Sequence, residues 1–134
     1  MKNILSVLFF LLCFISPVSS QSKSSFVRVE KGKFLLNGKP YYYVGTNFWY
    51  GAILASEGEG GNRGRLIKEL DNLKSIGINN LRILVGADGS NGIKSKVEPT
   101  LQKAPGVYND TIFDGLDFLL MEMAKRKMYA VLYI

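Results

Sequence analysis

The sequence has 134 residues, a formal net charge of +6, one cysteine and no histidine. Without histidine, these residues can form neither a His-based catalytic triad nor an HExxH zinc motif, and a single cysteine, Cys13, allows no internal disulfide. A hydrophobic share of 47% and a charged share of 21% indicate a globular protein, and the length allows one domain at most.

Residues 1–20 have the three-part layout of a secretory signal peptide. Lys2 supplies the charged start, residues 4–15 the apolar run, and Val18-Ser19-Ser20 a small-residue cleavage site. The apolar run has about 12 residues, whereas a membrane span needs about 20, so we expect a removable leader rather than an anchor. We therefore expect a secreted protein, extracellular or periplasmic, that leaves the membrane after cleavage, with residues 21–25 as a polar N-terminal stub.

A small antiparallel β-cap is predicted to come after the stub. Residues 26–30 alternate between apolar and charged side chains, and residues 34–36 form a second short strand. Directly after this second strand, Asn37-Gly38 is a strong hairpin signal. Residues 41–45 are then predicted to be a buried strand, which ends at the aromatic segment Thr46-Asn47-Phe48-Trp49-Tyr50.

Two helices and two further strands are predicted in the remainder. Gly77 ends the first helix, and Asn109 or Asp110 caps the second. The order strand, helix, strand, helix, strand predicts an α/β fold with a parallel sheet and right-handed crossovers. The predicted helices are residues 63–75 and 112–127, and the predicted strands are residues 78–85 and 129–134.

The connections that leave the strands, residues 48–62 and 86–108, are much longer than those that leave the helices. The second, residues 86–108, is predicted to be irregular. Long loops cost closure entropy and are usually functional or disordered. Both come after the carboxyl ends of strands, where α/β sheets and barrels place their sites, so this end of the sheet is the predicted binding face.

Several side chains at this face could bind a substrate. Asn47 and Trp49 combine an amide with an aromatic ring, which suits the hydroxyls and C–H faces of sugars, while Phe48 and Tyr50 are equally consistent with core residues. Arg82 lies within an apolar strand. It either emerges at the site and holds a carboxylate, or forms a structural ion pair, or is exposed at the strand end.

Other motifs carry less information. Glu57 and Glu59 are a close pair of acids, but their glycine-rich setting favours a solvated loop over a fixed glycosidase pair. Residues 88–92 are more typical of a turn than of a calcium loop. Asn109-Asp110-Thr111 is a glycosylation sequon. Basic residues are scattered rather than arranged in a stripe with aromatic residues, so no nucleic-acid partner is expected.

With these residues identified, residues 26–134 closely resemble the amino-terminal third of glycoside hydrolase family 5 β-mannanases. The resemblance rests on four segments, which are FLLNGKP at 34–40, VGTNFWY at 44–50, NLRI at 80–83 and PGVYNDTIFDGLD at 105–117. The last segment is the most specific of the four.

The resemblance implies an incomplete (β/α)8 TIM barrel, with about three strands and two helices behind the β-hairpin cap. It implies an enzyme that hydrolyses internal β-1,4 bonds of mannan, glucomannan or galactomannan with retention of configuration and without a cofactor or metal. Arg82 matches the arginine that hydrogen-bonds the nucleophile of the family, and Trp49 and Asn47 match the segment that lines the glycone side of the cleft. The two catalytic glutamates come after the fourth and seventh barrel strands in the family, so both are expected beyond Ile134.

A complete eight-stranded barrel needs about 250 residues, so the resemblance implies that these residues are a truncated enzyme. Without the two glutamates the 134-residue chain is expected to be inactive, and open sheet edges with an uncovered apolar face would make it prone to aggregation. Two alternatives remain open. One is another family 5 specificity, such as a cellulase or exo-mannosidase, and the other is a fragment that binds polysaccharide without cleaving it.

Overall fold

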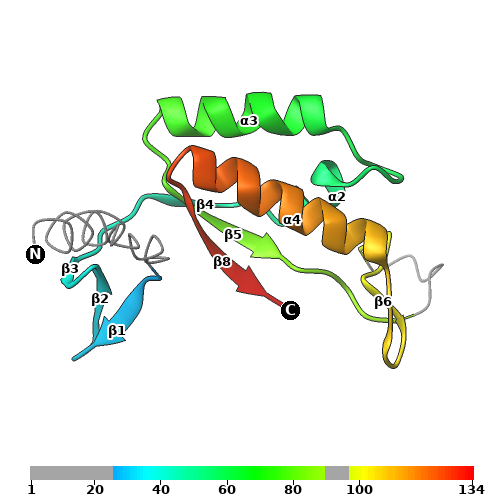
Figure 1. Cartoon of the computed structure of the whole chain (residues 1–134), viewed down its shortest axis with the longest axis horizontal. Coiled ribbons are helices and arrows are strands. Elements are labelled where there is room, and N and C mark those ends of the chain that lie inside the picture. Colours follow the sequence, from blue (N-terminus) through cyan, green and yellow to red (C-terminus); the bar gives the residue numbers. More distant parts are fainter. Residues whose placement is uncertain (1–25, 90–96) are drawn as a thin grey trace, which may run out of the picture. The chain divides into compact units, whose positions relative to one another are not determined.

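A computed structural model describes residues 26–89 and 97–134, and the chain divides into two compact units, residues 1–41 and 42–134 (Figure 1). The predicted leader and stub, residues 1–25, lie outside the described residues, as do residues 90–92 of the predicted turn. Among the helices of the described ranges, none combines the length and the hydropathy that crossing a bilayer requires.

The described residues of the first unit form an antiparallel sheet with two tight hairpins. Its strands are β1 (Arg28–Glu30), β2 (Lys33–Leu36) and β3 (Lys39–Pro40), in the order β1-β2-β3. The backbone φ angles are 49° and 75° at Lys31 and Gly32, and 53° and 76° at Asn37 and Gly38. Positive φ at both central residues is the type I′ geometry, whose twist matches that of the strands. The predicted β-cap and its Asn-Gly hairpin are therefore confirmed.

The second unit contains a parallel sheet covered by helices. Its strands are β4 (Gly45–Asn47), β5 (Asn80–Leu84) and β8 (Tyr129–Tyr133), in the order β4-β5-β8. The helices are α2 (Gly51–Ala55), α3 (Arg63–Ser75) and α4 (Asp110–Lys125). In Figure 1 the two long helices lie side by side over one face of the sheet. The predicted parallel sheet and the order of its elements are confirmed.

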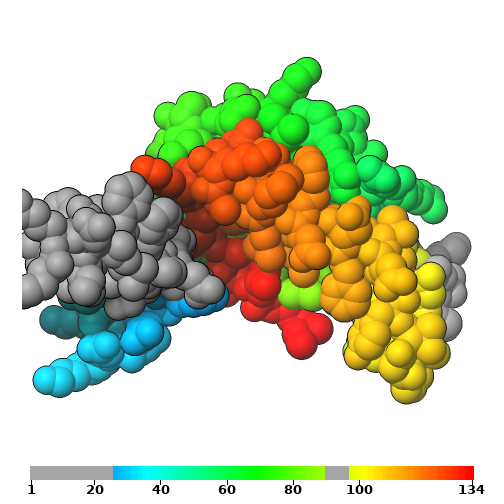
Figure 2. All heavy atoms as spheres, in the orientation of Figure 1, coloured from blue at the N-terminus to red at the C-terminus, as the bar shows by residue number. Residues whose placement is uncertain are grey.

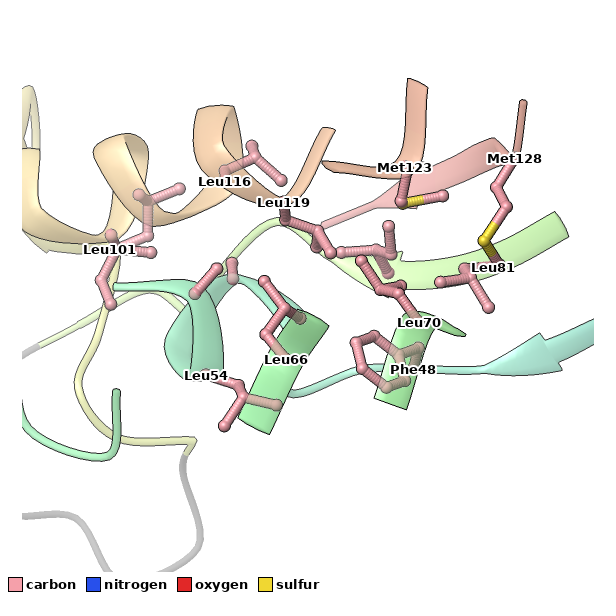
Figure 3. Close-up of a cluster of buried hydrophobic side chains, with 14 residues drawn as sticks. Phe48, Leu54, Leu66, Leu70, Leu81, Leu101, Leu116, Leu119, Met123 and Met128 are labelled. Carbon is pink, nitrogen blue, oxygen red and sulfur yellow. The ribbon is translucent and has the colours of Figure 1, made fainter. Parts of the chain in front are cut away.

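Alternation along β5 distinguishes the two faces of the sheet. Leu81 and Ile83 are fully buried beneath the helices, whereas Arg82 between them is exposed on the opposite face. The space-filling view shows α4 (orange) packed directly against α3 (green) (Figure 2). The side chains that meet beneath these helices, drawn in Figure 3, include Phe48, Leu54, Leu66, Leu70, Leu116, Leu119 and Met123.

The strand predicted at residues 41–45 is wrong in position, because the sheet begins only at Gly45. The backbone N–H of Val44 donates to Oδ1 of Asn79 at 3.0 Å, just before Asn80, where β5 starts and pairs with Gly45. A parallel ladder cannot begin before its partner strand does. The apolar residues ahead of Gly45 therefore stay outside the sheet, and Tyr42 is 84% exposed.

Both long connections contain regular structure, although the second was predicted to be irregular. In the first, α2 forms a short buried helix. In the second, β6 (Gln102–Ala104) and β7 (Val107–Tyr108) form a hairpin. Pro105-Gly106 joins its strands, with φ of 75° at Gly106. A proline before a glycine of positive φ is typical of a type II turn, and this signal could have predicted the hairpin.

Helix α4 (Asp110–Lys125) begins and ends two residues earlier than the predicted helix 112–127, and its N-cap, Asn109, is one of the two predicted caps. Asn109 occupies the N-cap position without a side-chain capping bond, and its Nδ2 instead donates to the carbonyl of Thr100 at 3.3 Å. The backbone N–H of Asn109 binds the carbonyl of Leu101 at 2.7 Å. The two hydrogen bonds of Asn109 therefore link the second connection to the start of α4.

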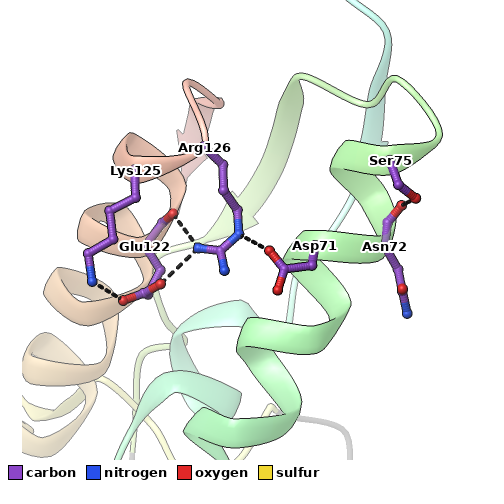
Figure 4. A network of polar contacts seen from close by, with 6 residues as sticks. All are labelled: Asp71, Asn72, Ser75, Glu122, Lys125 and Arg126. Carbon is purple, nitrogen blue, oxygen red and sulfur yellow. Dashed lines mark hydrogen bonds and ion pairs between the residues drawn. The ribbon is translucent and has the colours of Figure 1, made fainter.

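A charged network joins the carboxyl-terminal end of α4 to α3 (Figure 4). Arg126 donates from Nε to Asp71 of α3 at 2.7 Å and from Nη1 to Oε2 of Glu122 at 2.8 Å. Lys125 also binds Glu122, which is only 5% exposed. Hydrogen bonds from Lys125 and Arg126 lower the pKa of Glu122 even though burial would raise it. The buried carboxylate is thus held in its ionised form.

Candidate functional site

Arg82 lies in the centre of the sheet, on the face opposite the helices. Its neighbours in register are Asn47 on β4 and Val131 on β8. Its guanidinium carbon is 3.5 Å from the centroid of the Tyr133 ring, a cation–π contact. Within residues 26–89 and 97–134 Arg82 forms no ion pair, so the structural ion-pair interpretation finds no support there.

Arg82 and Asn47 line the same shallow hollow, about 330 Å³ in volume. Asn47 is the last residue of β4, so the hollow reaches the carboxyl end of that strand. A guanidinium group and an amide side by side can bind a carboxylate or several hydroxyl groups. The residues that line this Arg82 hollow are Tyr43, Gly45, Thr46, Asn47, Asn80, Arg82 and Val131.

Trp49 does not line this hollow with Asn47 and Arg82. The intervening residue, Phe48, is 2% exposed, and its ring belongs to the core, as one of the two interpretations predicted. After Phe48 the chain turns into α2, and the side chain of Trp49 lines another hollow, about 300 Å³ in volume, together with Ile53 and Arg65. The structure therefore brings two of the three predicted site residues together and sets the third apart. Their roles remain predictions.

Contacts among aromatic rings support the side chain of Trp49. Its ring meets the ring of Tyr50 edge-on, with centroids 5.6 Å apart, and Tyr50 in turn lies 4.6 Å from the buried ring of Phe48. The hydroxyl of Tyr50 donates to Oε2 of Glu69 at 2.9 Å, and Nε of Arg65 donates to Oε1 of the same carboxylate at 2.6 Å. Burial and, after it, the bond to Glu69 raise the pKa of Tyr50, so its hydroxyl stays protonated as a donor at neutral pH.

The carboxylate pair considered in the first connection is not arranged for catalysis. Glu57 accepts from Nη1 of Arg63 at 2.7 Å, whereas Glu59 is exposed. Arg63 also binds the carboxylate of Asp114 on α4, and its Nε donates to the carbonyl of Ala55 at 2.8 Å. Arg63 thus links the first connection to α4 through its bonds to Glu57 and Asp114. Across the described ranges, no three acidic, histidine or cysteine side chains gather in a way that could hold a metal ion.

Two residues of the Arg82 surroundings were not identified from the sequence. Asn80 lines the hollow and is 6% exposed, and Tyr133 contacts the guanidinium. The predicted strands 78–85 and 129–134 contain both residues, but their register does not follow from either strand alone. Pairing Arg82 with Val131 in a parallel ladder would have placed Tyr133 on the same face.

Comparisons with known proteins identify the family of the chain. Residues 24–134 match the family described as GH family 5 beta-mannosidase-like. Mannan endo-1,4-beta-mannosidase 1 of Oryza sativa subsp. japonica is 34% identical over 107 residues, which cover 80% of this chain and 23% of that protein. Mannan endo-1,4-beta-mannosidase 3 of Solanum lycopersicum is 30% identical over 125 residues, which cover 92% of this chain and 28% of that protein.

The chain is also similar to solved structures of glycoside hydrolase family 5 mannosidases. The crystal structure of a glycoside hydrolase family 5 mannosidase from Rhizomucor miehei has a TM-score of 0.76 and 34% identity, over 84% of this chain and 28% of that chain. A mutant of the Rhizomucor miehei mannosidase, in complex with mannosyl-fructose, also has a TM-score of 0.76, over 83% of this chain and 27% of that chain. The chain spans about a quarter of the length of the curated relatives it matches.

Proposed function

The chain belongs to the glycoside hydrolase family 5 β-mannosidase-like family, and we propose that it is the amino-terminal part of a retaining endo-β-1,4-mannanase. The observation that carries the proposal is the family match over residues 24–134. Relatives named mannan endo-1,4-beta-mannosidase, at 30% and 34% identity, support internal cleavage of mannan, glucomannan or galactomannan.

We propose that β4, β5 and β8 are the first three strands of a (β/α)8 barrel. In such barrels each strand leads into a helix on the outer face, and active sites lie at the carboxyl ends of the strands. The parallel order β4-β5-β8, with all of its helices in the crossovers, fits the start of that arrangement. The sheet face opposite the helices, which carries Arg82, is then the inner face of the barrel.

In the proposed mechanism, Arg82 orients a carboxylate and Asn47 binds a substrate hydroxyl. Retaining hydrolysis uses two carboxyl groups about 5–5.5 Å apart, one as acid/base and one as the nucleophile that forms a glycosyl-enzyme. We propose that both glutamates lie beyond Ile134 and that Arg82 hydrogen-bonds the nucleophile. An arginine can bind a carboxylate through two parallel N–H donors, which fixes its orientation and favours its ionised form.

The 134-residue chain alone is proposed to be inactive. Within the described residues, β4 and β8 are edge strands. Val44, directly before β4, is 61% exposed, and Val131, within β8, is 46% exposed. Unpaired edges and exposed apolar side chains favour aggregation. The lack of the two glutamates would abolish the chemistry even in a soluble preparation.

We also propose that residues 1–20 direct secretion and are removed. The charged start, the apolar run and the small residues before Gln21 support this assignment. Edman or mass-spectrometric analysis of the exported protein should find Gln21 at the amino terminus. A mature protein that retains residues 1–20 would contradict the assignment.

A β-mannosidase acting on short mannosides is the second candidate. The Rhizomucor miehei neighbour is named a mannosidase, and one of its mutants was crystallised with mannosyl-fructose. The two candidates differ in their products. An endo-acting enzyme releases oligosaccharides of mixed length, whereas an enzyme that cleaves terminal residues releases a single small sugar from the start.

The proposed function is tested on the protein expressed from its complete reading frame. Reducing ends and product lengths are measured on galactomannan, glucomannan and carboxymethylcellulose. Mixed mannooligosaccharides together with a rapid loss of viscosity would support the endo-mannanase. Release of mannose alone would support the second candidate, and cleavage of the cellulose derivative alone would contradict both. Mannan hydrolysis by the 134-residue chain would contradict the placement of the glutamates beyond Ile134.

A further inference from the structure

The sequon Asn109-Asp110-Thr111 has no part in the proposed catalytic function. We propose that Asn109 is a glycosylation site controlled by folding, whose amide can accept an N-linked oligosaccharide only while the second connection is not docked on α4. The folded protein should therefore accept no glycan at Asn109. The proposed secretion would bring this sequon to a transferase, whereas the proposed mannanase activity has no bearing on it.

The sequon lies at the start of a helix rather than in a loop. Asn109 is the N-cap residue of α4, and Asp110 and Thr111 belong to its first turn. The carbonyl oxygen of Asn109 accepts from the backbone N–H groups of Ile112 and Phe113, at 3.0 Å and 3.3 Å. Ile112, directly after the sequon, is only 1% exposed. Acceptor sequons typically lie in surface loops, whereas this one can become extended only if the first turn of α4 unwinds.

The atom that would carry the glycan is already a hydrogen-bond donor in the fold. Nδ2 of Asn109 donates to the carbonyl oxygen of Thr100 at 3.3 Å, and Thr100 is fully buried. The backbone N–H of Asn109 donates at 2.7 Å to the carbonyl oxygen of Leu101, a core residue drawn in Figure 3. Two adjacent buried residues of the second connection therefore hold both the backbone and the side chain of Asn109. Removal of Nδ2 would cost the buried carbonyl of Thr100 this partner.

Glycosyl transfer requires this nitrogen to be accessible. In the reaction, Nδ2 attacks C1 of the first sugar of an oligosaccharide that is linked to a polyprenyl diphosphate. A C–N bond forms, the bond between C1 and the diphosphate oxygen breaks, the lipid diphosphate leaves, and Nδ2 gives up one proton. The transferase has to reach Nδ2 from solvent, so transfer should depend on how often residues 100–101 separate from the start of α4.

Asn62 provides a comparison within the same chain. It is the N-cap residue of α3, but here Oδ1 accepts from the backbone N–H of Arg65 at 2.8 Å, and the residue is exposed. Within residues 26–89 and 97–134, Nδ2 of Asn62 donates to no group. Gly64→Thr would complete a sequon at Asn62, and the added Cβ atom has room, at 3.6 Å from Oδ1 of Asn62. This variant places an acceptor at the same helical position with its amide nitrogen free.

Gly86 offers a way to open the Asn109 site without changing the sequon. A Cβ atom on Gly86 would lie 2.1 Å from the Cβ atom of Leu101. Gly86→Ala must therefore displace Leu101, whose carbonyl oxygen binds the backbone N–H of Asn109. The variant should loosen the second connection at this point and increase transfer to Asn109.

The experiment uses the protein expressed from its complete reading frame in a host that does not glycosylate it. The wild type and the Gly64→Thr, Gly86→Ala and Thr111→Ala variants are incubated with an oligosaccharyltransferase and a lipid-linked oligosaccharide. The tryptic peptide 104–125 of the wild type is a further acceptor, in which the same sequon is free of the fold. Mass spectrometry measures the occupancy of each asparagine, and circular dichroism verifies folding.

We expect the occupancy of Asn109 in the intact wild type to be at least about tenfold lower than that of Asn62 in Gly64→Thr, because the closed form is favoured by buried hydrogen bonds. The peptide 104–125 should be glycosylated readily. Gly86→Ala should raise the occupancy of Asn109 toward that of the peptide, whether the variant opens locally or fails to fold. Thr111→Ala, which removes the sequon, should leave Asn109 unmodified.

Three outcomes would overturn the proposal. Equal occupancy of Asn109 in the intact wild type and in the peptide would show that the fold does not close the sequon. A peptide that accepts no glycan would show that the residues of the sequon themselves, rather than the fold, prevent transfer. An occupancy in Gly86→Ala as low as in the wild type would show that the contact with Leu101 does not control the site. Failure of the mannanase function would change none of these readings, because no readout depends on catalysis.

Discussion

The guanidinium of Arg82 lies against the ring of Tyr133, 3.5 Å from the ring centroid, although the two residues come from different strands. Arg82 pairs in register with Val131. Tyr133 comes two residues after Val131, so it lies on the same face and closer to the carboxyl end of the sheet. A cation–π contact of this kind limits the positions that the guanidinium can take. We propose that this contact helps to orient Arg82 toward a carboxylate at the carboxyl end of the sheet.

The first prediction concerns this contact. Tyr133→Leu should lower kcat on mannooligosaccharides about two- to fivefold, because a cation–π contact at a partly exposed site contributes about 0.5–1 kcal/mol. Tyr133→Phe keeps the ring and should keep kcat near the wild-type value. Steady-state kinetics of the protein from the complete reading frame provide the measurement. Equal losses in both variants would mean that the hydroxyl, rather than the ring, is the important group.

The second prediction concerns Arg82 itself. Arg82→Lys keeps the charge but loses the two parallel donors, and we expect kcat to fall at least about tenfold, the value of one charge-assisted hydrogen bond. Arg28→Lys, at an exposed position of β1, is the matched control and should leave kcat unchanged. A full rate in Arg82→Lys would show that Arg82 does not orient the nucleophile.

The third prediction concerns acid stability. The pKa of Glu122 is below its ordinary value of 4.5 in the folded protein, chiefly because Lys125 and Arg126 donate to it. A lowered folded pKa stabilises the protein above the unfolded pKa, and this stabilisation disappears as the pH falls through the folded pKa. The free energy of unfolding of the wild type should therefore decrease below about pH 4.5, and Glu122→Gln should lose less over the same interval.

Denaturant unfolding at pH 7, 5 and 3 measures this effect. Glu59→Gln, which replaces an exposed carboxylate of the first connection, is the control and should track the wild-type curve. Glu122→Gln should also be less stable at pH 7, because Lys125 and Arg126 lose a buried charged partner. If Glu122→Gln and the wild type show the same pH dependence, the network does not account for acid stability.

The long helices and the short connections that leave them were predictable, because the sequence signals for both are local. The apolar spacing of residues 63–75 and the glycine after it give α3 its observed bounds, Arg63–Ser75. The position of β4 was not predictable in this way, because its start depends on Asn79 and Asn80, more than 30 residues away. The five residues of α2 are too few to show a helical period, and buried packing against α4 stabilises this helix.

The candidate site was likewise predictable only where it depends on local sequence. Arg82 is the charged residue of an apolar strand, so its exposure on one face follows from strand alternation. The separation of Trp49 from Asn47 was not predictable, because it depends on the side chain of Phe48 entering the core and on the turn into α2. The contact with Tyr133 depends on the register of two strands joined by a long crossover, which no local pattern contains.

The fourth prediction concerns the crossing of α2 and α4. A Cβ atom on Gly115 of α4 would lie 2.3 Å from the carbonyl oxygen of Ala52 and 2.8 Å from the backbone nitrogen of Ser56. Both of these atoms belong to the backbone and cannot move away cheaply. Gly115→Ala should therefore lower the free energy of unfolding by about 1–3 kcal/mol, even though alanine is the better helix former.

Gly64 of α3 is the matched control for this prediction. A Cβ atom there would meet only Oδ1 of Asn62, at 3.6 Å, which is ordinary van der Waals contact. Gly64→Ala should raise the free energy of unfolding by about 0.5 kcal/mol, because alanine favours the helix and nothing opposes it. Thermal and denaturant unfolding of the two variants should thus change in opposite directions. A stabilising Gly115→Ala would show that α2 and α4 do not approach each other as closely as this backbone contact requires.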